Sequence, residues 1–170
     1  LNRNPMSIFQ VEGAKEIALE LNSLSKSFNM SGWRVGMILG NKTFLEAVLK
    51  VKSNMDSGMF YGIQKGAIEA LSLDKNWFES QNEVYSKRRN LLFELVEKLS
   101  CSYNKTSVGL FIWAKLPKNV ISSETFIDTI LIDKNIFITP GTIFGSNGEG
   151  YIRFSLCIEE EKIKEALARF

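Results

Sequence analysis

The sequence contains no histidine. Its absence excludes the Ser-His-Asp and Cys-His mechanisms of nucleophilic catalysis, and it excludes most zinc sites. Proton transfer in any active site must therefore be carried out by lysine, aspartate, glutamate, tyrosine or cysteine side chains.

Cysteine is also scarce. Cys101 and Cys157 lie far apart in the sequence and form no CxxC motif. This spacing favours two reduced thiols in or near the core over a disulfide or a catalytic thiol.

Long hydrophobic runs are missing. No apolar stretch reaches the roughly 18–20 residues that span a bilayer. Residues 1–5 lack the apolar segment of a signal peptide, and the chain does not begin with methionine. These features predict a cytoplasmic protein without a membrane partner, and they indicate a fragment or a processed piece.

Excess charge is absent too, since the formal net charge is only +2. Such a balance gives no indication of a nucleic-acid partner. The short basic run at residues 87–89 falls on a predicted helix, where a solvated face is a better interpretation than a binding patch. With 170 residues, 45% of them hydrophobic, the chain can bury a core.

Hydrophobic periodicity and breaker residues predict a mixed α/β architecture. A domain boundary is expected within residues 52–75, where small and polar residues cluster. Asp74 is a candidate N-cap for a long helix that follows it. The predicted strands are 17–21, 35–39, 108–115, 136–139 and 151–157, and the other predicted helices are 44–51, 61–71, 122–134 and 159–170.

The segment from Ser23 to Gly36 carries the strongest indication of chemistry. A lysine, Lys26, stands among small hydroxyl residues, and Arg34 follows between two glycines. A lone lysine is ordinarily a solvated side chain. In this setting, however, the amine suits a Schiff base with an aldehyde cofactor, while hydroxyls and a guanidinium could hold a phosphate. The alternatives are an ion-paired surface role for Arg34 and a purely structural role for Ser25.

Arg153 is a further candidate. In the predicted strand 151–157, the period-2 rule places Ile152, Phe154 and Leu156 on one face and Arg153 on the other. An arginine among apolar neighbours needs a partner. That partner could be an internal carboxylate or the carboxylate of a substrate, which a guanidinium binds with two hydrogen bonds.

The glycine-rich segment, residues 140–150, first suggests a phosphate-binding loop. It lacks the Gly-Lys-Ser/Thr ending of a P-loop and the spacing of a dinucleotide-binding motif. A turn-rich connection between two strands is the better interpretation.

The pattern S-x-S-K followed by G-x-R-x-G resembles the class I/II aminotransferases of fold type I, which use pyridoxal phosphate. Residues 5–15 and 109–117, and the P-G-x-x-F-G and G-E-G-Y-x-R sequences within 140–153, also resemble this family. The nearest branch comprises LL-diaminopimelate and aspartate-type aminotransferases. The resemblance covers essentially the whole chain, but it matches only the C-terminal part of a full family member.

This resemblance implies an α/β fold: residues 1–60 would be the tail of the large pyridoxal phosphate domain, and residues 61–170 the α+β small domain. It implies that Lys26 bonds the cofactor and carries a proton between substrate and cofactor. Amino acids and 2-oxo acids would be the substrates, and the parent enzyme a homodimer. The truncated chain alone is expected to be inactive. The implied cofactor ligands are Ser23, Ser25, Lys26 and Arg34, and the implied ligand of the α-carboxylate is Arg153.

Two alternatives stay open. A β-lyase or decarboxylase of the same fold keeps the same lysine motif, and analysis of the products would separate it from an aminotransferase. A non-catalytic domain on this scaffold is the other alternative, against which the intact Lys26, Arg34 and Arg153 argue.

Overall fold

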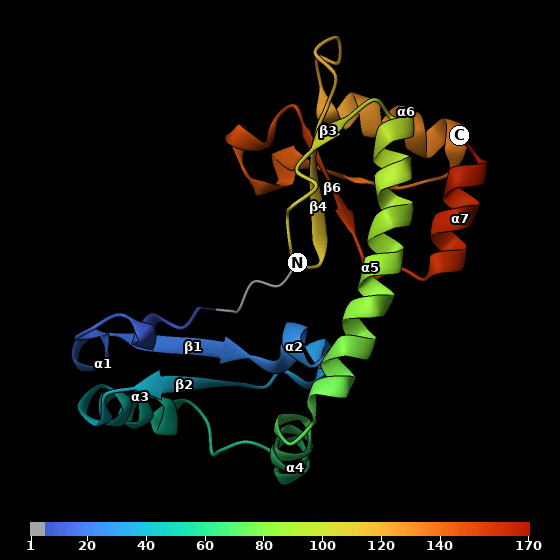
Figure 1. Ribbon diagram of the computed structural model, residues 1–170. Coiled ribbons are helices and arrows are strands. Elements are labelled where there is room, and N and C mark those ends of the chain that lie inside the picture. The colour runs from blue at the N-terminus through green and yellow to red at the C-terminus, as the bar shows by residue number, and fades with distance from the viewer. Residues whose placement is uncertain (1–5) are drawn as a thin grey trace. The chain divides into compact units, whose positions relative to one another are not determined.

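The computed structural model describes residues 6–170, so residues 1–5 of the predicted domain 1–60 lie outside the described residues. The chain divides into two compact units between Asp74 and Lys75 (Figure 1). We call residues 6–74 the N-terminal region and residues 75–170 the C-terminal region. The helix at residues 61–71 therefore belongs to the N-terminal region. The assignment of residues 1–60 and 61–170 to two domains of a parent enzyme stays a prediction.

The N-terminal region is built on a two-stranded antiparallel hairpin with Leu19 opposite Gly40 and Ser23 opposite Gly36. The first strand starts later than predicted, because residues up to Ile17 form a short helix. Its elements in order are η1 Ile8–Gln10, α1 Ala14–Ile17, β1 Leu19–Ser23, α2 Leu24–Ser27, η2 Ser31–Trp33, β2 Gly36–Gly40, α3 Lys42–Met55 and α4 Tyr61–Leu71.

The two longer helices of this region differ in what they bury. Asn41 caps α3, since its side-chain oxygen accepts a hydrogen bond of 2.9 Å from the Thr43 N–H. No residue of α3 is buried. By contrast, α4 contributes the buried Ala70 to a small apolar cluster, with Ile63 and Ala67 packed against it. The periodic pattern thus predicted both helices, but only α4 packs its apolar side into this cluster.

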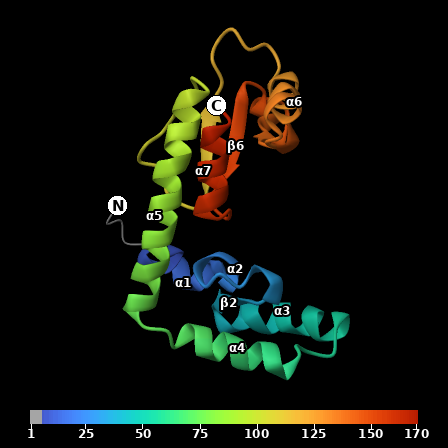
Figure 2. The ribbon, with the colours of Figure 1, turned by 90° about the vertical axis from the view of Figure 1, so that its right-hand side faces the viewer.

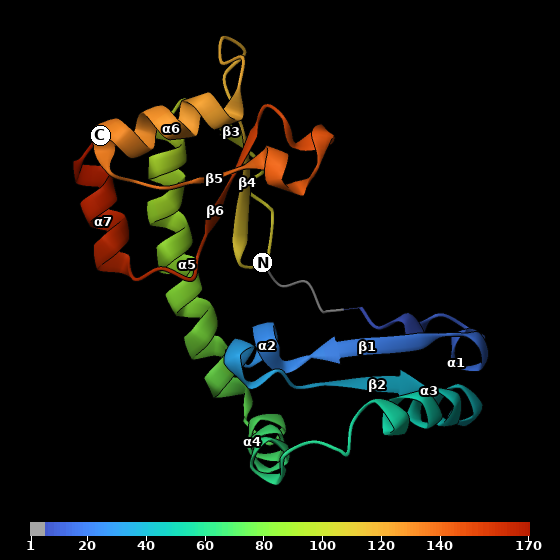
Figure 3. The same cartoon turned by 180° about the vertical axis from the view of Figure 1, so that it is seen from behind.

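The C-terminal region is a four-stranded antiparallel sheet in the order β3-β4-β6-β5 (Figure 3). Its elements in order are α5 Lys75–Lys98, β3 Ser102–Tyr103, β4 Phe111–Lys115, α6 Ser123–Lys134, β5 Thr139–Pro140, η3 Gly141–Phe144, η4 Ser146–Gly148, β6 Tyr151–Ser155 and α7 Glu160–Ala168. Ser122 caps α6, because its hydroxyl accepts a hydrogen bond from the Thr125 N–H.

One face of this sheet forms the core. Figure 2 shows α5 and α7 side by side along β6. Ile152 and Phe154 of β6 are buried there, together with Leu156 just after the strand, as the period-2 rule predicted. Burial of a side chain such as Ile152 stabilises the fold by about 1.5–3 kcal/mol. The opposite face of β4 and β6 stays at least partly exposed, and it carries aromatic side chains and Arg153.

Two strand predictions need correction. The strand predicted at residues 136–139 is limited to Thr139–Pro140, since only these two residues pair with β6. Strand β3 was not predicted, because two residues are too few to show an alternating pattern. Both cases depend on pairing with a distant strand.

The basic run at residues 87–89 is not simply a solvated face. Lys87 pairs with Glu83 at 2.8 Å. The Arg88 guanidinium donates to the Leu156 carbonyl at 3.1 Å, and Arg89 donates to the Gly109 carbonyl at 2.6 Å. Arg88 and Arg89 therefore connect α5 to backbone carbonyls that lie far from it in the sequence.

The prediction of two reduced thiols in or near the core is also corrected in part. Both thiols are free, and Cys101 is buried, which raises its pKa to about 11. Cys157, expected in or near the core, is exposed. Among the helices of residues 6–170, none has the length and apolar character needed to cross a membrane.

Candidate active site

Residues 23–35, from the last residue of β1 to the residue before β2, hold most of the candidate residues, and we call this segment the lysine loop. Three of its side chains, Leu24, Met30 and Val35, are buried in the apolar cluster that includes Ala70 of α4. The Leu24 N–H donates to the Val35 carbonyl at 3.1 Å, which closes the loop at its base. The apolar residues of the loop therefore anchor it, and the polar ones face outward.

Ser23 and Lys26 lie at opposite ends of the short helix α2. Ser23 is its N-cap, and the Ser23 hydroxyl oxygen accepts a hydrogen bond of 3.2 Å from the Ser25 N–H. Lys26 is exposed in the last turn. Within residues 6–170 it forms no ion pair or hydrogen bond. Since the sequence has no carboxylate between Glu20 and Glu46, the loop itself supplies no acidic partner for the amine.

Arg34 occupies an unusual backbone conformation. Its φ is +53°, in the left-handed region that non-glycine residues seldom adopt. Its neighbours are both held: Val35 is buried, and the Trp33 ring lies against α4 where Gly66 leaves room. The exposed guanidinium makes one hydrogen bond within residues 6–170, to the Ser31 carbonyl at 3.2 Å. Most of its donors therefore remain available for an anion.

The two glycines that flank Arg34 differ in how closely other backbone atoms approach them. A Cβ at Gly36 would lie 2.7 Å from the Asn22 carbonyl oxygen, so the close approach of β2 to β1 requires glycine there. A Cβ at Gly32 would meet no atom of the described residues within 4 Å. Packing within the described residues therefore requires glycine at position 36 and not at position 32.

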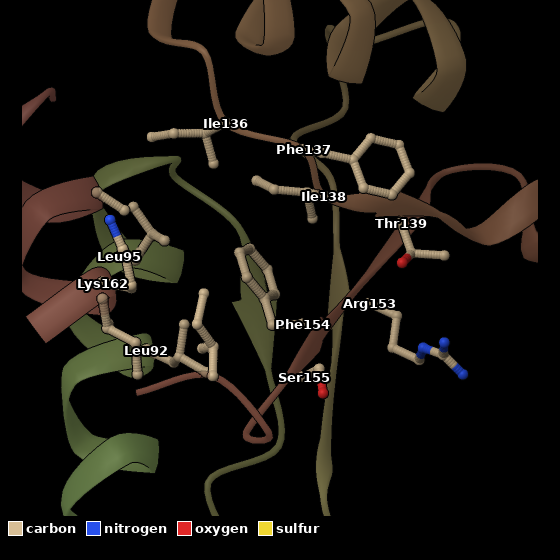
Figure 4. Close-up of a pocket in the computed structure, with 13 residues that line it drawn as sticks. Leu92, Leu95, Ile136, Phe137, Ile138, Thr139, Arg153, Phe154, Ser155 and Lys162 are labelled. Carbon is tan, nitrogen blue, oxygen red and sulfur yellow. The ribbon is translucent and has the colours of Figure 1, made fainter. Parts of the chain in front are cut away.

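Arg153 lies in the C-terminal region, at the centre of β6, opposite Trp113 of β4 and Thr139 of β5. Its side chain points away from Phe154 and Leu92, which face the helices (Figure 4). Within residues 6–170 it makes no ion pair and no hydrogen bond. The internal salt bridge considered as an alternative is therefore not formed within this part of the chain.

Aromatic rings take the place of an acidic partner. The Arg153 Cζ lies 4.3 Å from the centre of the Phe111 ring and 4.4 Å from that of Phe144. Contacts of this kind attract a guanidinium to the faces of the rings and leave its N–H groups free to donate. Beside them, the Trp113 ring stacks on Tyr151 at 5.4 Å. The half-buried arginine is thus placed to bind a planar anion.

Sequence reasoning missed Phe111 and Phe144 as partners of Arg153. The sequence does indicate the position of Phe111, because alternation along residues 111–115 puts it on the same face of the strand as Trp113. Phe144 belongs to the glycine-rich segment, which the structure shows to be a turn-rich connection between β5 and β6, as predicted. No local pattern indicates that its ring reaches Arg153.

A cavity of about 240 Å³ lies between α5, α7 and the β5–β6 edge, and Arg153 is among the residues that line it (Figure 4). Its walls are mostly apolar, from residues such as Leu92, Leu95 and Ile163. It contains none of the lysine-loop residues, and the Arg153 guanidinium points away from it. We therefore place the candidate chemistry outside this cavity. No group of three or more potential metal ligands occurs in residues 6–170.

The lysine loop thus brings Ser23, Ser25, Lys26 and Arg34 together, while Arg153 belongs to the other region. Comparison with known families matches residues 2–170 to the family described as aminotransferase class I and II. The chain belongs to this family.

Individual aminotransferases are similar along nearly the whole chain. The LL-diaminopimelate aminotransferase of Halothermothrix orenii is 45% identical over 166 residues, covering 98% of this chain and 42% of the relative. That of Maridesulfovibrio salexigens is 39% identical over 168 residues, covering 99% of this chain and 43% of the relative. The chain thus spans less than half the length of these aminotransferases.

Solved structures agree with this assignment. The substrate-bound BacF structure from Bacillus subtilis superposes with a TM-score of 0.88 at 36% identity, covering 99% of this chain and 43% of that one. An aromatic aminotransferase from Pyrococcus horikoshii gives a TM-score of 0.88 at 27% identity, with 99% and 45% covered. The mixed α/β fold predicted from the sequence is that of the aminotransferases.

Proposed function

We propose that this chain is the C-terminal part of a pyridoxal phosphate-dependent aminotransferase, which transfers an amino group between an amino acid and a 2-oxo acid. Enzymes of this family generally depend on pyridoxal phosphate. The observation that carries the proposal is the lysine loop, in which Lys26, Arg34 and the hydroxyls of Ser23 and Ser25 stand on a single anchored segment without a carboxylate.

This set of donors fits the cofactor. A phosphate needs hydrogen-bond donors and positive charge, and Arg34 offers a planar fork of N–H groups. The Ser23 hydroxyl uses a lone pair to accept the Ser25 N–H, so its own hydrogen is available for a phosphate oxygen. Lys26 is exposed and makes no ion pair in residues 6–170, as an amine that must reach an aldehyde requires.

When bound, pyridoxal phosphate supplies an aldehyde carbon and an electron-withdrawing ring. In this proposal Lys26 removes the proton from the Cα atom of the amino acid and carries it as an ammonium group. Arg34 and Ser23 hold the phosphate, and Ser25 contributes a second hydroxyl.

Arg153 has the separate task of binding the α-carboxylate. The rings of Phe111 and Phe144 hold the guanidinium by cation–π contacts, and its N–H groups make no hydrogen bond within residues 6–170, so they can meet the two carboxylate oxygens. A substrate held at this group presents its Cα in a fixed orientation. The homodimeric state stays a prediction from the resemblance, and the cytoplasmic location stays a prediction from the sequence.

The test is to find which lysine bonds the cofactor in the full-length enzyme that contains this chain. Borohydride reduction followed by peptide mass mapping should attach a pyridoxyl group to Lys26. The variant Lys26→Ala should lose the label, whereas Lys50→Ala, which changes an exposed lysine of α3, should keep it. A label on any other lysine would contradict the assignment.

A further inference from the structure

The glycine-rich segment crosses its own backbone at two glycines. A Cβ at Gly141 would lie 2.1 Å from the Gly148 carbonyl oxygen, and one at Gly148 would lie 1.9 Å from that of Gly141. Both residues are buried. The residues between them therefore form a closed loop whose base admits no side chain, and Phe144 stands on this loop.

Two carboxylates tie the segment to the start of α6. One oxygen of Glu149 accepts three hydrogen bonds of 2.8 Å, from the Ser123 N–H, the Ser123 hydroxyl and the Gly150 N–H. The Thr142 hydroxyl donates to Glu124 at 2.8 Å. Ser123 is fully buried, so the hydrogen bonds of Glu149 connect the segment to a residue that is held in place by its surroundings.

The two rings on Arg153 are held in different ways. Phe111 belongs to β4, and pairing with β6 fixes its backbone opposite Ser155. Phe144 is outside the strands, so its place depends on the loop, on the ties that hold the loop, and on the edge contact of its ring with Trp113 of β4 at 5.7 Å. Only the Phe144 contact with Arg153, at 4.4 Å, is thus sensitive to Glu149.

We propose that Glu149 is a positioning residue for the carboxylate site: it fixes the glycine-rich segment to α6 and so holds the Phe144 ring on the Arg153 guanidinium. This inference rests on the proposed function of Arg153. Glu149 itself touches no substrate. Its effect is to keep the guanidinium in one orientation before a carboxylate arrives, so that less freedom is lost on binding.

Protonation of Glu149 would weaken this tie, and the hydrogen bonds themselves oppose protonation. The donor groups of Ser123 and the Gly150 N–H lower the pKa of the Glu149 carboxyl below its ordinary value. The tie is therefore charge-assisted throughout the neutral range.

A double-mutant cycle in the full-length enzyme tests the proposal. Glu149→Ala should raise the KM for the amino acid on the order of tenfold, with a smaller change in kcat. Glu149→Gln keeps an acceptor oxygen and should restore part of the loss. Glu161→Ala, an exposed glutamate of α7 without such ties, is the matched control and should change nothing.

The double-mutant cycle is completed by introducing Glu149→Ala into an enzyme that already carries Arg153→Ala. There, Glu149→Ala should have no further effect on KM, because its influence passes through the guanidinium. Equal losses in both backgrounds would overturn the positioning role and leave a structural one. If Arg153→Ala itself left KM unchanged, the proposed function of Arg153 would fail instead.

Phe144→Leu provides a second approach, in case Glu149→Ala does not fold. It removes only a half-exposed ring, and it should reproduce the rise in KM in the wild-type background alone. An unchanged KM for Phe144→Leu would also overturn the proposal.

Discussion

The two regions of the chain differ in how much core each one has. In residues 75–170, fourteen buried residues form one cluster between the sheet and its helices. In residues 6–74 the corresponding cluster has four. The candidate cofactor ligands nevertheless stand on the region with the smaller core. The candidate groups thus stand on a short anchored loop, while most of the buried apolar residues of the described chain lie in the other region.

The largest expected effect is on the stability of the C-terminal region. Leu156→Ala removes a fully buried side chain and should destabilise this region by about 3–5 kcal/mol. Leu24→Ala, in the small cluster, should leave protection of β4 and β6 amides unchanged. Hydrogen exchange monitored by mass spectrometry measures both. If Leu24→Ala lowered protection in β6 as strongly as Leu156→Ala does, the two regions would unfold as one unit.

The second prediction separates the two arginines. In the full-length enzyme, Arg153→Ala should weaken substrate binding by on the order of 3 kcal/mol, because a charge-assisted contact is lost. Its affinity for pyridoxal phosphate should stay near that of the wild type. Arg34→Ala should show the reverse pattern. Titrations with cofactor and with a 2-oxo acid decide between these outcomes, and a loss of both affinities in either variant would argue against separate roles.

The third prediction uses the two glycines beside Arg34. Gly36→Ala places a methyl group 2.7 Å from the Asn22 carbonyl, so the hairpin must open, at a cost of about 1–3 kcal/mol. Gly32→Ala meets no described atom within 4 Å and is the matched control for stability. Thermal unfolding and cofactor titration of both variants give the measurement. Equal losses of stability would show that the hairpin contact is not the reason for glycine at position 36.

The smallest effect concerns Glu149 and pH. Its pKa is lowered in the folded state by hydrogen bonds from Ser123 and Gly150. A lowered folded pKa means that the stabilisation is present above the ordinary value of 4.5 and is lost as the pH falls through the folded pKa. The difference in Tm between wild type and Glu149→Gln should therefore shrink as the pH falls below 4.5. A difference that stays constant with pH would exclude the carboxylate as its source.

Periodicity predicted the helices and the central strands because those elements are long enough to show a repeating pattern. The helix at residues 61–71 was predicted with the bounds that it has. By contrast, β3 and β5 are defined by pairing with distant strands, and no window of a single sequence contains that pairing.

The candidate site shows the same limit. The order of residues in the lysine loop allowed Ser23, Lys26 and Arg34 to be predicted, since all of them lie in one short segment. The contact of Phe144 with Arg153, and the hydrogen bonds from Ser123 to Glu149, join different elements of the fold across intervening segments of the sequence. Their prediction would have required the sheet register and the course of the glycine-rich segment.

The packing of Trp33 on Gly66 and of Trp113 on Tyr151 has an optical consequence. One indole lies next to Arg34, the proposed cofactor ligand, in the chain, and another lies on the aromatic face around Arg153. In a Trp77→Phe background these two are the only indoles left in the chain. Binding of the cofactor should quench the fluorescence of Trp33, and binding of the substrate should quench that of Trp113. Intrinsic fluorescence would then separate the two binding events without an added dye.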